Sequence, residues 1–191
     1  RMENSVKILR LLLENSQARF SIRKISESLK MNYRIAHEKV IQLEKEGLVK
    51  LTPIGNTRLC EITSKFSSRV FEAEYERAKD AMKNKDILII TKALSELDFP
   101  FIALLFGSHA SSTQDRHSDI DILTVGGDRK KIEECISLLP DKIHLTPVTY
   151  AEFSHMAKSR EFSVVGEALK SNVILLGIED FYRLLENVKR A

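Results

Sequence analysis

Cysteine is scarce in this chain of 191 residues, which contains only Cys60 and Cys135, far apart in the sequence. Such an isolated pair matches neither the disulfide framework of a small secreted domain nor the spacing of a zinc site. Long apolar runs are also lacking, because the longest, Phe99 to Phe106, is far shorter than the roughly 20 residues of a membrane-spanning helix. No signal-peptide pattern precedes this run. We therefore expect a cytoplasmic protein that does not contact a membrane.

The chain also lacks internal repeats and low-complexity segments, and its five histidines show no metal-ligand spacing. A chain of this length can form one large or two small domains, each with a core of its own. The charge is distributed unevenly along the chain. Residues 1–64 carry 12 Lys and Arg against 7 Asp and Glu, whereas residues 65–191 carry 18 Lys and Arg against 20 Asp and Glu. A small basic module joined to a mildly acidic one indicates a nucleic-acid contact at the front of the chain.

The most informative stretch lies in the second half of the chain, where an apolar run ends at Gly107-Ser108 and a second one contains Asp119-Ile120-Asp121. On a strand, the alternation Asp-Ile-Asp sends both carboxylates to one face. Such carboxylates repel each other unless a cation lies between them, and Mg²⁺ typically takes one or two carboxylates plus substrate phosphates. Glycine allows a phosphate to approach the backbone, and the serine hydroxyl can donate to it. An Asp-x-Asp pair without the Gly-Ser element would more often be a solvated pair.

This pattern of G-S-x-A, a gap that ends in serine, and D-I-D resembles the nucleotidyltransferase superfamily that includes polymerase β, and most closely its minimal members. The resemblance covers about residues 85–177 and implies a short mixed sheet with flanking helices. It also implies transfer of a nucleoside monophosphate from a triphosphate, with ATP as the expected nucleotide and Mg²⁺ as the cofactor. Asp119 and Asp121 would be the catalytic and metal-binding carboxylates, and Gly107, Ser108 and Ser118 would bind the nucleotide. The residues on the motif are Gly107, Ser108, Ala110, Ser118, Asp119, Ile120 and Asp121.

The chain departs from the family pattern at two places. Active members usually carry a third carboxylate on the following strand, where this chain has Thr146, with His144 two residues earlier on the same face. Threonine binds neither a proton nor Mg²⁺ well, and His144 could be either a base or a packing residue. Ser111-Ser112 replaces the Arg-Gly that often follows G-S-x-A. The sequence therefore supports binding of a metal and a nucleotide better than it supports turnover.

The basic front module has the pattern of three helices followed by a hairpin. Apolar residues at helical spacing predict helices over residues 3–15, 22–30 and 33–46. Two alternating runs, 48–51 and 58–62, flank a turn with Gly55-Asn56 and predict a hairpin.

This arrangement resembles the winged helix-turn-helix family of DNA-binding domains. By that resemblance, residues 33–46 form the recognition helix that enters the major groove of double-stranded DNA. The candidates for base or phosphate contact are Asn32, Tyr33, Arg34 and His37, and the candidates for backbone phosphates are Lys39, Asn56 and Arg58. The alternatives are a solvated helix face and a winged helix that binds protein.

These patterns together predict an α+β protein with a winged helix-turn-helix domain over residues 1–63 and a polymerase β-like nucleotidyltransferase domain over residues 86–191. Residues 64–85 are expected to form a connecting helix whose apolar stripe packs on the second domain or pairs two chains in a homodimer. The second domain is expected to contain the following elements. Strands are predicted over 101–106, 119–125, 143–149 and 173–176, and helices over 87–97, 110–113, 128–139, 150–158, 161–170 and 178–189.

Three functional hypotheses follow from this organisation. The first is a DNA-binding enzyme that transfers a nucleotidyl group to a protein side chain, as in antitoxin-type transferases that modify a toxin partner, or to an RNA end. The second is a transcriptional regulator whose transferase-like domain is a nucleotide sensor or a dimerisation platform without turnover. In the third, both domains are only interaction domains. The missing third acid favours a regulator with a retained nucleotide site and leaves catalysis open.

Overall fold

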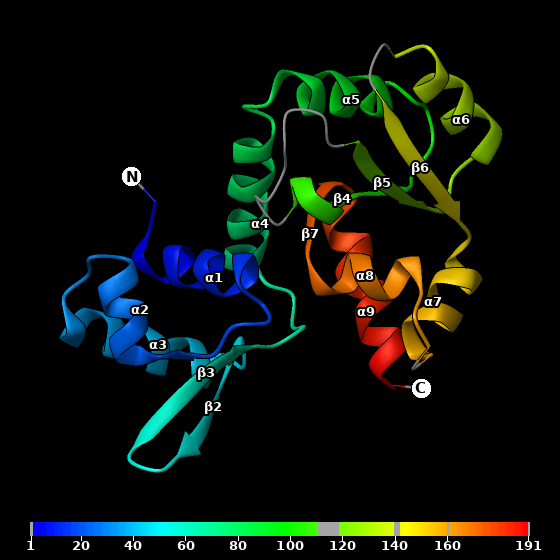
Figure 1. Cartoon of the computed structure of the whole chain (residues 1–191). Helices are drawn as coiled ribbons and strands as arrows, with labels where there is room; N and C mark the ends of the chain where they lie inside the picture. Colours follow the sequence, from blue (N-terminus) through cyan, green and yellow to red (C-terminus); the bar gives the residue numbers. More distant parts are fainter. Residues whose placement is uncertain (1, 111–118, 140–141, 160, 191) are drawn as a thin grey trace. The chain divides into compact units, whose positions relative to one another are not determined.

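The computed structural model describes residues 2–110, 119–139, 142–159 and 161–190 (Figure 1). The chain divides into two compact units, Arg1–Glu76 and Arg77–Ala191. The boundary falls inside helix α4 (Ser68–Ala81), which is shorter at both ends than the helix expected over residues 64–85. Within the described part of the chain, no helix has both the length and the apolar character needed to cross a membrane.

The first unit contains three helices and a hairpin, as the sequence predicts. Its helices are α1 (Asn4–Glu14), α2 (Ile22–Ser28) and α3 (Tyr33–Lys45), and its strands are β1 (Phe20–Ser21), β2 (Val49–Ile54) and β3 (Thr57–Ile62). The helices enclose fully buried side chains, among them Leu9, Ile25 and Leu43. The strand order is β1-β3-β2, and β1, which was not predicted, pairs Phe20 with Cys60. A strand of two residues is too short to leave a period-two pattern in the sequence.

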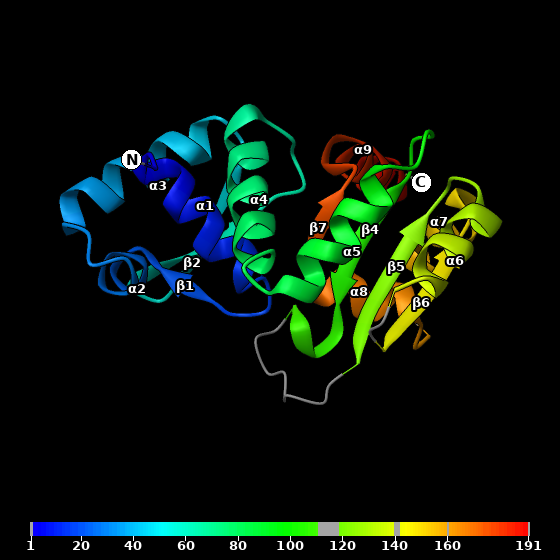
Figure 2. The same ribbon diagram turned by 90° about the horizontal axis from the view of Figure 1, so that it is seen from above.

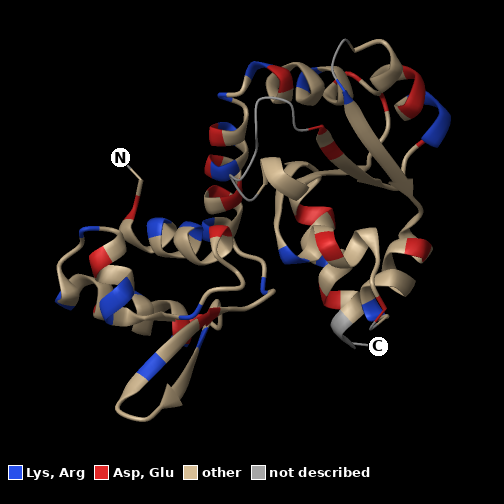
Figure 3. Ribbon diagram, viewed as in Figure 1, with Lys and Arg blue, Asp and Glu red and all other residues tan. Residues whose placement is uncertain are grey.

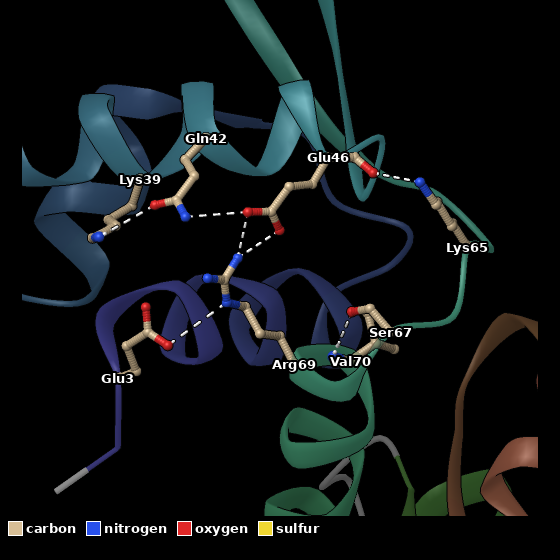
Figure 4. A network of polar contacts seen from close by, with 8 residues as sticks. All are labelled: Glu3, Lys39, Gln42, Glu46, Lys65, Ser67, Arg69 and Val70. Carbon is tan, nitrogen blue, oxygen red and sulfur yellow. Dashed lines mark hydrogen bonds and ion pairs between the residues drawn. The ribbon is translucent and has the colours of Figure 1, made fainter.

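A polar network joins the start of α4 to the end of α3 within the first unit (Figure 4). Arg69 Nη1 donates to both carboxylate oxygens of Glu46, one of them at 2.6 Å. Gln42 Nε2 donates to Glu46 Oε1 at 3.1 Å, and Lys65 Nζ donates to the Glu46 carbonyl oxygen at 2.7 Å. The hydrogen bond from Arg69 lowers the pKa of Glu46 below its ordinary value, and the same bond raises the pKa of Arg69.

The second unit contains a four-stranded mixed sheet with the strand order β6-β5-β4-β7 (Figure 2). The parallel pair is β5 with β6, and the other neighbours are antiparallel, which agrees with the expected mixed sheet. Pro147, which cannot donate to a ladder, lies on the edge strand β6. The strands are β4 (Ile102–Phe106), β5 (Ile120–Val125), β6 (Ile143–Val148) and β7 (Asn172–Leu176). The helices are α5 (Lys85–Ser95), α6 (Arg129–Ser137), α7 (Tyr150–Lys158), α8 (Val164–Lys170) and α9 (Ile178–Arg190), with a 3₁₀ turn η1 (Gly107–His109) after β4.

Helices cover both faces of this sheet (Figure 1). Ala103 and Leu105 of β4 and Ile122 of β5 share one buried cluster with apolar residues of α5 and α6. On the opposite side lie α7, α8 and α9, which contribute buried residues such as Phe153 and Val165. All five residues of β4 are buried, so the central strand is apolar on both faces. The sequence changes from apolar to polar where β4 ends and β5 begins, and the motif residues Gly107 and Asp121 lie at that edge of the buried sheet.

One helix of the second unit begins later than the sequence predicts, and another predicted helix falls largely outside the described residues. Helix α8 begins at Val164 rather than at residue 161, because Ser163 Oγ accepts from the backbone N–H of Gly166 at 3.0 Å and caps the helix there. Of the helix expected over residues 110–113, only Ala110 is described, and it is the C-cap of the 3₁₀ turn η1. Residues 111–113 lie outside the described part.

The network at Arg69 gives a test of stability. Replacing Arg69 with Ala should lower the free energy of unfolding of the first unit by about 1 kcal/mol, since Glu46 is about a third exposed and solvent screens the pair. Because the folded-state pKa of Glu46 is lowered, this contribution is present above the unfolded-state pKa, about 4.3, and is lost as the pH falls through the folded value. Urea unfolding at pH 7 and at pH 3 measures both effects. Arg23→Ala, which removes a more exposed pair with Glu27, is the control and should cost less; equal losses would contradict this account.

Candidate functional site

The two halves of the sequence motif meet at one end of the sheet in the second unit. Antiparallel pairing of β4 with β5 sets Phe106 opposite Asp121, so Gly107, the next residue, lies against the Asp121 carboxylate. A Cβ atom at position 107 would lie 2.4 Å from Asp121 Oδ2 and 3.2 Å from its Cγ. The backbone of Gly107 is also left-handed, with φ of +69°, a conformation that favours glycine. Both conditions require glycine here, and they explain its place in the motif.

The other residues predicted to bind the nucleotide or the metal differ in their position and exposure. Ser108 follows Gly107 in η1 and is half-buried. Asp119 is exposed and directly precedes β5, and the Asp121 side chain is 27% exposed, so both carboxylates are accessible to a solvent-borne ligand. Ser118 lies outside the described residues. The structure therefore brings Gly107, Ser108 and Asp121 together and leaves the prediction for Ser118 untested.

The neighbouring strand β6 adds a residue that the sequence analysis considered only as an alternative. The parallel ladder sets His144 opposite Asp121 and Thr146 opposite the fully buried Leu123. His144 Nδ1 lies 3.3 Å from Asp121 Oδ1. The side chain beside the motif carboxylate is thus His144, whereas Thr146, which the family pattern indicates for a third acid, pairs further along the sheet. The period-two pattern shows which residues share a face, and only strand register shows which of them is opposite Asp121.

The side chains at this end of the sheet can be compared with the ligands that a divalent metal ion requires. Over the described residues, no three His, Cys, Asp or Glu side chains gather closely enough to form a metal site by themselves. Mg²⁺ ordinarily takes only one or two carboxylates from the protein and completes its octahedron with phosphate oxygens and water. Asp119 and Asp121 can supply that share.

The first unit has a groove of about 280 Å³ between the start of α3 and the tip of the hairpin. Four of the predicted DNA-contacting residues line it, two from the start of α3 and two from the hairpin, although the two pairs are far apart in the sequence. Between Val49 and Cys60 the hairpin carries Lys50 and Arg58 and no Asp or Glu (Figure 3). The lining residues are Ile22, Arg23, Tyr33, His37, Asn56, Thr57 and Arg58. Arg23 was not among the residues predicted to contact DNA, because the apolar spacing that predicts α2 marks only the buried face of this helix.

The three remaining predicted residues of this unit lie elsewhere on α3. Arg34 shares a second open groove, of about 510 Å³, with His37 along the outer face of the helix. Asn32 Oδ1 accepts from the Arg34 backbone N–H at 2.9 Å and caps α3. Lys39 Nζ donates to Gln42 Oε1 at 3.3 Å on the flank that faces the Arg69 network, and it lines neither groove (Figure 4).

The contact between Gly107 and Asp121 can be tested by coupling two substitutions. Gly107→Ala should lower the free energy of unfolding by about 2–3 kcal/mol, because a left-handed alanine is strained and its Cβ displaces the carboxylate. In the Asp121→Ala background the same change should cost about 1 kcal/mol less, since the obstacle is gone. Denaturant unfolding of the four proteins measures this coupling. Gly55→Ala, at φ of +57° with open space around it, is the control and should show no coupling to Asp121; additive losses at position 107 would refute the contact.

Comparison with known proteins agrees with the geometry of the second unit. Residues 88–171 match the family model for a nucleotidyltransferase domain. The matched range contains both halves of the motif, the strand with His144, and helices on both faces of the sheet. No curated protein and no solved structure matches the chain. The second unit of this protein therefore carries a nucleotidyltransferase-like domain.

Proposed function

We propose that the nucleotidyltransferase-like domain binds a nucleoside triphosphate, with ATP as the expected nucleotide, together with Mg²⁺ where β4 ends and β5 begins. The observation that carries this proposal is the contact between Gly107 and the Asp121 carboxylate, which only glycine permits. The Gly107-Ser108 turn offers a backbone without a side chain and a hydroxyl donor for phosphate oxygens. Asp119 and Asp121 would hold the cation, which when bound offsets the repulsion between carboxylates and phosphates.

The same site can transfer a nucleoside monophosphate. In that reaction an acceptor oxygen, on a protein side chain of a toxin-type partner or on a nucleic-acid end, attacks the α-phosphorus and pyrophosphate leaves. The acceptor oxygen must lose its proton, a step that a third carboxylate would assist. His144 rather than an acid lies opposite Asp121, and this observation favours the second candidate function, a nucleotide sensor without turnover.

For the first unit we propose a winged helix-turn-helix domain that binds double-stranded DNA and makes the protein a transcriptional regulator in the cytoplasm. The support is the groove that joins Tyr33 and His37 of α3 to Asn56 and Arg58 of the hairpin. In such a domain the helix start contacts base edges and the hairpin contacts backbone phosphates. The positive charge of residues 1–64 suits a polyanion.

A homodimer through α4 is part of the same proposal. The apolar stripe expected on this helix divides into a buried side, with Val70 and Ala73, and an exposed pair, Phe71 and Tyr75. Their side chains are about half exposed, which suits a surface that a second chain covers. Sedimentation equilibrium of the wild type and of Phe71→Ser/Tyr75→Ser would measure this association.

Nucleotide binding can be measured by calorimetry with ATP and Mg²⁺. The Asp119→Ala/Asp121→Ala variant should lose at least about tenfold in affinity, because the cation that bridges the protein and the triphosphate loses its carboxylates. Asp98→Ala, which removes an exposed carboxylate outside the site, is the matched control. Undiminished metal-dependent binding by the double variant would rule out the site. A pyrophosphate assay on the wild type then separates an enzyme from a sensor.

DNA binding can be measured by fluorescence anisotropy over a series of salt concentrations. Arg58→Ala should weaken binding to all duplexes and lower the slope of log K against log salt by about 1, as expected for one phosphate contact. Lys39→Ala should have a smaller effect, because its ammonium group is hydrogen-bonded to Gln42 away from the groove. An unchanged slope for Arg58→Ala would contradict the docking mode.

A further inference from the structure

The Asp121 carboxylate has different neighbours on its two oxygens. Oδ2 lies against the backbone of Gly107, and Oδ1 lies 3.3 Å from His144 Nδ1. The second contact follows from strand register, because the parallel ladder of β5 and β6 sets the two residues directly opposite each other. The sheet itself therefore holds an imidazole nitrogen beside the carboxylate.

This pair is open to a solvent-borne ion. The His144 side chain is 67% exposed and the Asp121 side chain 27% exposed, and β6 is an edge strand. Two ligands that each lie about 2.1 Å from one octahedral or tetrahedral ion are about 3.0–3.4 Å apart. The separation of Nδ1 from Oδ1 falls in this range, so the distance between the two atoms suits one shared ion.

The chemistry of the two donors differs from that of a pair of carboxylates. Mg²⁺ is a hard ion that prefers oxygen ligands, whereas imidazole nitrogen favours first-row transition ions. Mn²⁺ shares the octahedral preference of Mg²⁺ and accepts carboxylate and phosphate oxygens together with nitrogen. A site that combines Asp121, His144 and phosphate oxygens would therefore differ more in its affinities for Mn²⁺ and Mg²⁺ than a site made of carboxylates alone.

We infer that His144 and Asp121 together bind a divalent cation at the nucleotide site, and that His144 makes this site prefer a first-row transition ion, such as Mn²⁺, to Mg²⁺. The inference rests on the proposed nucleotide site and deepens it. The Nδ1 atom is the ligating atom, since it is the one that faces Asp121.

The test uses metal binding rather than activity. Mn²⁺ and Mg²⁺ are titrated separately, in the presence of inorganic triphosphate, into the full chain and its variants. The wild type should bind Mn²⁺ more tightly than Mg²⁺. His144→Ala should lose at least about tenfold in Mn²⁺ affinity, as even outer partners of a metal site cost this much, and should change Mg²⁺ affinity far less. His144→Asp, which offers an oxygen ligand instead, should raise Mg²⁺ affinity relative to Mn²⁺.

A spectroscopic readout separates ligation from a hydrogen bond. Electron spin echo modulation of bound Mn²⁺ should show coupling to an imidazole ¹⁴N in the wild type, because inorganic triphosphate contains no nitrogen. His144→Asn is the matched control, since its amide can still hydrogen-bond to Asp121 but is a poor ligand. It should lose both the ¹⁴N coupling and the preference for Mn²⁺.

Two results would overturn the inference, and they can be told apart. If Asp121→Ala abolishes metal binding while His144→Ala and His144→Asn keep the Mn²⁺ preference, His144 is only a hydrogen-bond partner and the nucleotide site stands. If Asp121→Ala binds both metals as the wild type does, the proposed nucleotide site fails as well. Circular dichroism of each variant controls for folding, and the exposed position of His144 on an edge strand favours intact variants.

Discussion

The pairing register of β4 with β5 is the constraint on which the candidate site of the second unit depends, because it brings the Asp121 carboxylate to the backbone of Gly107. The contact exists because β4 and β5 pair in one register, and a slip by one residue would turn Asp121 into the core. Burial of β4 on both faces, against α5 and α6 on one side and α7 to α9 on the other, holds that register. The buried layers are therefore what position two polar residues at the end of the sheet.

In the first unit, helix α3 makes a different set of contacts on each of three sides. Its buried flank, with Ala36, Val40 and Leu43, packs in the core of the unit. A second flank, with Tyr33 and His37, lines the groove towards the hairpin, and a third carries Lys39, Gln42 and the Glu46 cap into the network with Arg69. The 3.6-residue period of a helix separates these sets, so the groove and the network can change independently by substitution.

Much of this architecture could be predicted because it depends on local patterns. The helices of the first unit follow from apolar spacing, their starts from capping residues such as Ser21, and the hairpin from the Gly55-Asn56 turn. Helix α8 begins three residues later than the spacing of apolar residues predicts, because the hydrogen bond from the Gly166 backbone N–H to Ser163 fixes its start at Val164. The charge of Lys39 is visible in the sequence, whereas its hydrogen bond to Gln42 is visible only in the structure.

By itself, the sequence determined that a Gly-Ser turn and an Asp-Ile-Asp strand occur in one domain, because motif and periodicity are properties of neighbouring residues. Only the tertiary structure decided which atoms those residues meet. Strand pairing brought Gly107 to Asp121 Oδ2, and an in-register parallel ladder, rather than proximity in the chain, brought His144 to Oδ1. Register depends on how both faces of the whole sheet are buried, and that physical condition is not written in any single stretch of the chain.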